Sequence, residues 1–194
     1  MGPYHAMMAH FPVALWITAS VILIARALWD NALARSLDRV LVPLLALGLV
    51  TGVMTYVLGL LVWPADTLQT TPLGRNHMMA ATWSMFYWAA VMVLRWWVGE
   101  KCWTGLSNRL IMLGLGALGG GLLAITGTIG GHLHGAPSFL TDVLRQIGWE
   151  VYATFYLPDW VLLVLAVVIV VMPIVSIVTS RQRLAELRRG RGGA

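Results

Sequence analysis

The segment VLVPLLALGLVTGVMTYVLGLLVW, residues 40–63, contains no charged side chain. A helix needs about 20 apolar residues to cross the hydrocarbon core of a bilayer, which is about 30 Å thick. Residues 40–63 are therefore long and apolar enough to span a membrane. No water is available in lipid to bond the backbone, so this segment must satisfy its own N–H and C=O groups by forming a helix.

Four further segments have the same character, and together they predict an all-α, integral membrane helix bundle. The five expected transmembrane helices are residues 7–29, 40–63, 77–98, 110–133 and 157–178. The 194-residue chain is 59% hydrophobic and only 11% charged, whereas soluble domains carry about 25% charged residues. We expect a single transmembrane domain over residues 1–180 and a basic cytoplasmic tail over 181–194. The first span is interpreted as a retained helix rather than a cleaved signal peptide, because no basic residue precedes it.

Basic side chains sort the connecting segments into two sets. The connectors after the first and third spans and the C-terminal tail carry most of the arginine and lysine, and the other two connectors carry one arginine each. Basic loops remain in the cytoplasm, so we expect the N-terminus outside and the C-terminus in the cytoplasm. This pattern accounts for the net charge of +5 and argues against a nucleic-acid partner. The outer connector over residues 138–156 is predicted as either an amphipathic surface helix or a packed loop.

All five histidines of the chain fall on the predicted outer side. His5 and His10 lie at the first span, His77 begins the third, and His132 and His134 end the fourth. A single histidine at a helix end is most often an interfacial polar residue, but polar groups in the apolar layer indicate function. Imidazoles from three helices at one depth suit a metal ion or a haem iron. The expected iron ligands are His10, as the most deeply embedded, with His77, His134 and His5.

The residues around these histidines leave alternatives open. Small residues on one face of the fourth span allow close approach of either a neighbouring helix or a flat porphyrin; they are Gly116, Gly120, Gly127 and Gly131. Arg75 is placed either to neutralise a haem propionate or simply to lie at the membrane interface. Methionines beside the histidines would suit copper, although methionine is also a common core residue; they are Met7, Met8, Met78 and Met79. The single cysteine, Cys102, excludes a CxxCH haem attachment.

The opening motif His5-x4-His10-Phe11-Pro12 resembles the start of a family of small bacterial membrane proteins, which typically open HPxxVHFPIAL and have four or five spans. The resemblance extends over about residues 4–135 through three short motifs, which are Thr51-Gly52, Arg75-Asn76-His77 and Gly130-Gly131-x-Leu133. Members of that family resemble membrane b-type cytochromes. This chain departs from the pattern at Ala6, where the family has proline, and at His132-Leu133-His134, which leaves open which of these two histidines is the ligand.

The resemblance implies one or two b haems near the periplasmic face of a multi-pass protein of the bacterial inner (cytoplasmic) membrane. The expected function is electron transfer between the quinone pool and an extracytoplasmic redox partner, namely a c-type cytochrome, a Rieske protein or a molybdenum/iron–sulfur subunit. No nucleophile triad, phosphate loop or carboxylate pair indicates catalysis by the chain itself. A quinone site would be lined by Trp83, Trp149 or Tyr152. The alternatives are a copper- or haem-handling transporter or sensor, and a haem-free membrane anchor of a redox complex.

Overall fold

A computed structural model describes residues 2–63, 66, 70–153, 160, 163, 164, 167 and 171. Every regular element of these residues is a helix, as the sequence predicts. In chain order they are α1 (Gly2–Leu28), α2 (Ala32–Asp38), α3 (Leu41–Val62), α5 (Pro72–Val98), the 3-10 helix η1 (Gly99–Trp103), α6 (Gly105–Leu133) and α7 (Phe139–Gln146).

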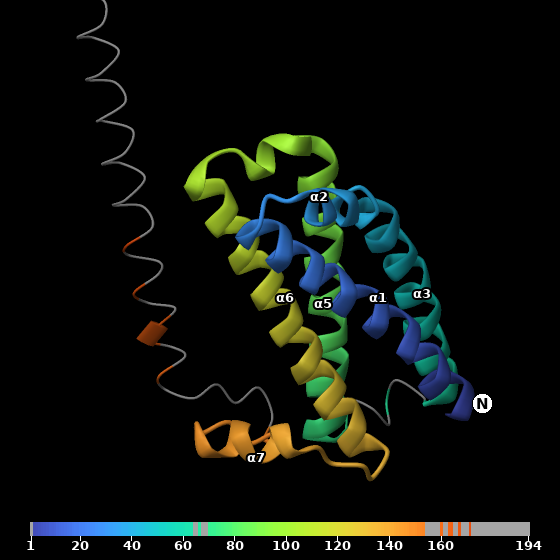
Figure 1. Cartoon of the computed structure of the whole chain (residues 1–194). Coiled ribbons are helices and arrows are strands. Elements are labelled where there is room, and N and C mark those ends of the chain that lie inside the picture. The colour runs from blue at the N-terminus through green and yellow to red at the C-terminus, as the bar shows by residue number, and fades with distance from the viewer. Residues whose placement is uncertain are drawn as a thin grey trace, which may run out of the picture.

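The four long helices α1, α3, α5 and α6 form a bundle, and each is long and apolar enough to cross a membrane (Figure 1). These helices correspond to the first four predicted spans, but α1, α5 and α6 each begin five residues earlier than expected. For α5 the cause is local, because the Thr71 side chain caps the helix by accepting a bond from the Gly74 N–H and Pro72 occupies the first turn. His77 therefore lies within α5 rather than at its start. The predicted fifth span, 157–178, is outside the described residues apart from single positions, and the tail 181–194 lies wholly outside them.

The centre of the bundle is built around two buried tryptophans. Trp16 of α1 and Trp88 of α5 stack with their ring centroids 6.3 Å apart. Gly48 and Gly52 of α3 leave room for Trp16, and Gly119 of α6 leaves room for Trp88, since a Cβ at any of the three would overlap an indole ring. Small residues thus let the helices approach closely, as is common in membrane bundles.

The predicted glycine face of α6 divides into two parts. Gly116 and Gly120 face α1, where an added Cβ would meet Leu23 and Ser20. At these two positions the close helix approach is confirmed. A Cβ at Gly127 would meet nothing within 4 Å, and one at Gly131 would meet the carbonyl of Ala136 just beyond the helix.

The two ends of the bundle differ in chemistry. Figure 1 shows α2 and η1 at one end, and the N-terminus and α7 at the other. This agrees with the predicted sorting of the connectors into two sets. Exposed tryptophans on the helices next to α2 and η1, Trp29, Trp96 and Trp97, are typical of a membrane interface. Of the two alternatives for residues 138–156, the amphipathic helix is found as α7, which lies across the end of the bundle.

Candidate functional site

His5 faces the interior of the bundle from the first turns of α1. Its Nδ1–H donates to the carbonyl oxygen of Thr55 in α3 at 3.0 Å. The ring packs on Gly59, where an added Cβ would lie 2.9 Å from the Cε1 atom of His5. Because a carbonyl can only accept a hydrogen bond, this contact places the proton on Nδ1 and leaves Nε2 with a free lone pair. Ligating histidines are commonly oriented by such a bond through the other ring nitrogen.

His134 is brought to the same place from the end of α6. Its Nδ1–H donates to the carbonyl oxygen of Gly130 at 2.9 Å, so its Nε2 is also the unprotonated nitrogen. Trp63, at the end of α3, lies between the two histidines. Its ring centroid is 5.4 Å from that of His5 and 5.5 Å from that of His134, edge to face in both cases. The Trp63 indole therefore sets the spacing of these two imidazoles.

His77 of α5 is the most enclosed of the three. Its ring packs against Gly130 of α6, where a Cβ would lie 2.9 Å from the Cε1 atom of His77. The Thr126 carbonyl is nearby, but the buried Nδ1 of His77 makes no hydrogen bond of good geometry. His77 lies near both His5 and His134. We call His5, His77 and His134 the histidine cluster. The structure thus brings together three of the four predicted iron ligands, one from each of three helices.

His10 is not part of this cluster. It follows His5 by five residues, which turns it by about 140° around a helix with 100° between successive residues. With His5 facing inward, the His10 ring is exposed on the outer surface of α1, and its Nδ1–H donates to the Ala6 carbonyl of the same helix at 2.7 Å. The structure therefore does not bring His10 together with the other histidines, because the apolar residues after it do not indicate which face of α1 turns inward.

His132 points away from His134, as two residues of separation on a helix require. Both of its ring nitrogens are engaged, Nδ1 with the Tyr152 hydroxyl at 2.7 Å and Nε2 with the Thr141 hydroxyl at 2.6 Å. These bonds attach α7 and the following turn to the end of α6. Of the two alternatives for the ligand in this helix, the geometry favours His134, whose Nε2 has no such partner.

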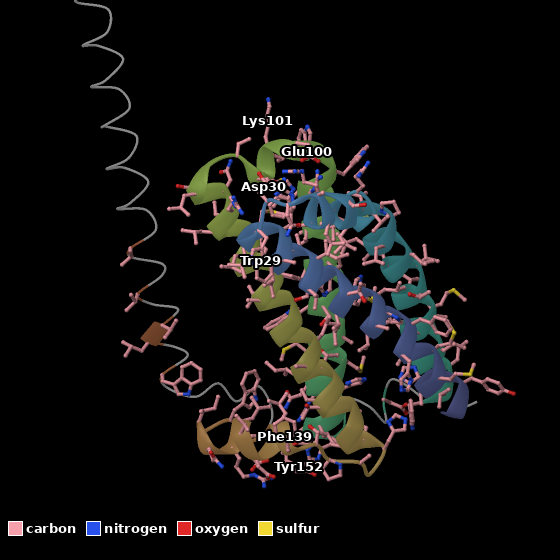
Figure 2. The ribbon with its side chains drawn as sticks, viewed as in Figure 1. Trp29, Asp30, Glu100, Lys101, Phe139 and Tyr152 are labelled. Atoms are coloured by element: carbon pink, nitrogen blue, oxygen red, sulfur yellow. The ribbon has the colours of Figure 1, made fainter. Side chains whose placement is uncertain are left out.

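The remaining predicted site residues lie around the cluster rather than within it. Arg75 is half-buried at the start of α5, two residues before His77 and so on a different face of the helix. Trp83 is exposed on α5, and Trp149 is half-buried after α7. Tyr152 is exposed near α7, with its hydroxyl bound to His132 (Figure 2).

A charged pair stabilises the turn after α7. Arg145 donates to the Glu150 carboxylate at 2.9 Å, and this hydrogen bond lowers the pKa of Glu150 below its ordinary value of 4.5. The Tyr152 N–H donates to the other oxygen of Glu150 at 3.2 Å. Glu150 therefore stays ionised at neutral pH and connects α7 to the residue that binds His132.

The donor set distinguishes a bare metal ion from a haem. Within the described parts of the chain, no three His, Cys, Asp or Glu side chains are grouped closely enough to hold a metal ion. Structural zinc takes four protein ligands and catalytic zinc three, whereas a haem iron needs two because the porphyrin supplies the other four. Two features fit a haem ligand set. The buried Nδ1 atom of His77 has no hydrogen-bond partner. The rings of His5 and His77 also pack directly on glycines, where an added Cβ would overlap them.

Comparisons of the chain with protein-family models, with curated proteins and with solved structures find no match. The histidine cluster is therefore interpreted from its own geometry. Three of its surroundings were missed by sequence reasoning: Trp63, Gly59 and the Thr55 carbonyl. Trp63 and Gly59 lie in an apolar transmembrane segment, in which tryptophan and glycine are common whether or not a site is present. Only the helix register shows that they face His5.

Proposed function

We propose that this chain is a membrane-embedded, b-type cytochrome-like subunit that binds haem at the histidine cluster and takes part in electron transfer. The observation that carries the proposal is the convergence of His5, His77 and His134, from α1, α5 and α6, at one end of a transmembrane bundle. Ionisable and strongly polar groups are costly at membrane depth and mark functional sites. Neutral imidazole is the form that ligates iron.

His5 and His77 are the residues that would hold one haem b. His5 and His77 are half-buried, whereas His134 is exposed, and the Thr55 carbonyl fixes the His5 tautomer so that Nε2 is the ligating nitrogen. A haem with two imidazole ligands supplies one-electron oxidation and reduction. Trp63 shields one side of His5 and separates it from His134, which would ligate a second haem or hydrogen-bond to the first.

The haem proposal is favoured over a copper transporter or sensor by the number and kind of donors. The cluster offers imidazoles that are spaced by Trp63 rather than gathered around one point. Of the methionines that would complete a copper site, Met7 is exposed. Two imidazoles are sufficient only where a porphyrin provides the remaining ligands.

The position of the cluster determines how electrons would reach it. The positive-inside rule favours a cytoplasmic location for the end with α2 and η1, so the cluster would lie at the periplasmic face of a bacterial inner membrane. A cofactor at one face does not carry electrons across the bilayer by itself. We infer an extracytoplasmic partner, such as a c-type cytochrome, a Rieske protein or a molybdenum/iron–sulfur subunit, and exchange with quinone at the same side. The surface of α7 would receive the partner.

Visible spectroscopy of the purified chain tests the proposal. A haem b with two histidine ligands should give a dithionite-reduced α-band at about 560 nm. His77→Ala and His5→Ala should each abolish or shift this band and lower the bound haem. His10→Ala is the matched control, because it removes an imidazole from the same helix that faces away from the cluster.

Two outcomes would refute the assignment. If protein expressed with adequate haem supply carries no haem, the chain is an anchor or a transporter rather than a cytochrome. If His10→Ala loses the band and His77→Ala retains it, haem binds on the outer surface of α1, as the sequence alone suggests. Copper measured in the same preparations by elemental analysis tests the competing metal.

A further inference from the structure

A second site lies at the opposite end of the bundle from the histidine cluster. An open hollow of about 610 Å³ is found between the end of α1 and the start of α6. Much of its wall is apolar, including Leu28, Leu106 and Leu110, all of which are also exposed at the outer surface of the bundle. In a membrane these residues face lipid tails, so the hollow is open to the bilayer.

The polar part of the hollow carries fixed positive charge. Arg109 lines it, and its Nε–H donates to the carbonyl oxygen of Ala27 in another helix at 2.8 Å. This bond holds the guanidinium against the wall while the terminal nitrogens stay available. Arginine presents such nitrogens as a planar fork that matches the oxygens of a phosphate.

Asp30 also lines the hollow but does not make it acidic. Its Oδ1 accepts bonds from Arg26 at 2.8 Å and from Arg35 at 2.7 Å. The Arg35 bond lowers the pKa of Asp30, so the carboxylate is ionised and is matched by more than one guanidinium. Figure 2 shows Asp30 at this end, with Trp29, Glu100 and Lys101. Because Arg26 and Arg35 match Asp30 from outside the lining, the charge of Arg109 is left unmatched among the residues that line the hollow.

The hollow therefore has a positively charged part and an apolar part, and its ligand must match both. A free phosphate would satisfy the guanidinium but leave the leucines uncovered. A neutral quinone would cover the leucines but leave the positive charge unmatched. We infer that the hollow binds an anionic phospholipid of the leaflet at this end, with its phosphate at Arg109 and an acyl chain along Leu106, Leu110 and Leu113. Basic pockets between membrane helices are a known means of binding lipid headgroups.

Native mass spectrometry of the detergent-purified chain measures this binding directly. The chain is mixed with equal amounts of phosphatidylglycerol and phosphatidylcholine that carry the same acyl chains. We expect one phosphatidylglycerol to be retained in preference to phosphatidylcholine. Arg109→Gln should weaken its retention about tenfold, the effect of losing one charged hydrogen bond.

Two further variants separate this site from general attraction to basic protein. Arg39→Gln removes an exposed charge at the same end that does not line the hollow, and it should retain the lipid. Leu110→Trp fills the hollow from its exposed rim without changing charge, and it should lower retention even if Arg109→Gln fails to fold. Equal retention of the two lipids, an equal loss in Arg39→Gln, or displacement by excess inorganic phosphate would each overturn the inference.

Discussion

Replacing Arg95 with glutamine is expected to destabilise the bundle strongly, although Arg95 is far from the histidine cluster. Arg95 donates from Nε and Nη2 to the two carboxylate oxygens of Asp38, at 3.1 and 2.5 Å. The Arg95 side chain is 9% exposed and that of Asp38 is 1% exposed. Without Arg95, Asp38 keeps a single donor, the indole N–H of Trp103 at 3.1 Å. A carboxylate would then be buried with one neutral hydrogen bond.

The loss of stability in each variant depends on which charged group the substitution leaves unpaired. Removing one member of a buried ion pair costs about 3–5 kcal/mol, and Arg95→Gln should fall in that range. Asp38→Asn should cost less, because Arg95 still pairs with Glu100 at 2.9 Å, and the Glu100 side chain is 72% exposed and well solvated. The double variant Arg95→Met with Asp38→Leu should recover most of the loss, since a buried pair replaced by apolar residues of similar size is often neutral.

Reversible unfolding of the chain in mixed micelles, followed by tryptophan fluorescence, gives the free energies of these variants, and the single variants Arg95→Met and Asp38→Leu complete the double-mutant cycle. The expected order of stability is parent, Asp38→Asn and Arg95→Gln, with the double variant near the parent. If Arg95→Gln loses less than about 1 kcal/mol, water reaches Asp38 and the pair is not buried. If the double variant loses the sum of two single losses, the residues act independently and the assigned pairing is wrong.

Two further predictions concern packing and pH. Gly48→Ala places a Cβ within the adjacent buried indole ring and should lower the free energy of unfolding by about 1–3 kcal/mol. Gly121→Ala, which meets nothing within 4 Å, should be neutral or slightly stabilising; equal losses in the two would show that helix approach does not depend on these glycines. The Arg145–Glu150 pair should hold its turn above pH 4.5 and release it as pH falls through the lowered pKa of Glu150. The protection factors of amides 148–153, which correct exchange rates for their intrinsic pH dependence, should fall over that interval. Glu150→Gln should remove this pH dependence of protection, and its persistence in the variant would exclude the pair as its cause.

The transmembrane helices were predictable from sequence because lipid leaves the backbone few choices. Any long uncharged segment must become a helix, so 40–63 locates α3 to within one residue at each end. The first residue of each helix was harder to predict, because a first turn that contains polar residues is not recognised by its hydropathy. The early start of α5 could have been found from Thr71-Pro72, a capping residue followed by a proline suited to the first turn.

The details of the cluster depend on which face of each helix turns inward, and hydropathy does not specify this for a helix that is apolar all round. His5 and His10 lie on opposite sides of α1, and only packing against Gly59 shows which one faces the bundle. Arg95 illustrates the same limit. In the sequence it is one of several basic residues near a helix end, but the fold buries it against Asp38 of the unexpected helix α2.

An unpartnered buried nitrogen does not by itself identify a ligand site. The Nε1 atoms of Trp16 and Trp88 also lack hydrogen-bond partners, yet an indole N–H is only a donor and cannot ligate iron. His77 differs because a neutral imidazole always carries one unprotonated nitrogen. At the other end of the bundle, buried Arg95 and Asp38 satisfy each other. At the cluster, the Nδ1 atoms of His5 and His134 each donate to a backbone carbonyl, which leaves their Nε2 atoms as the nitrogens that the proposed haem would take.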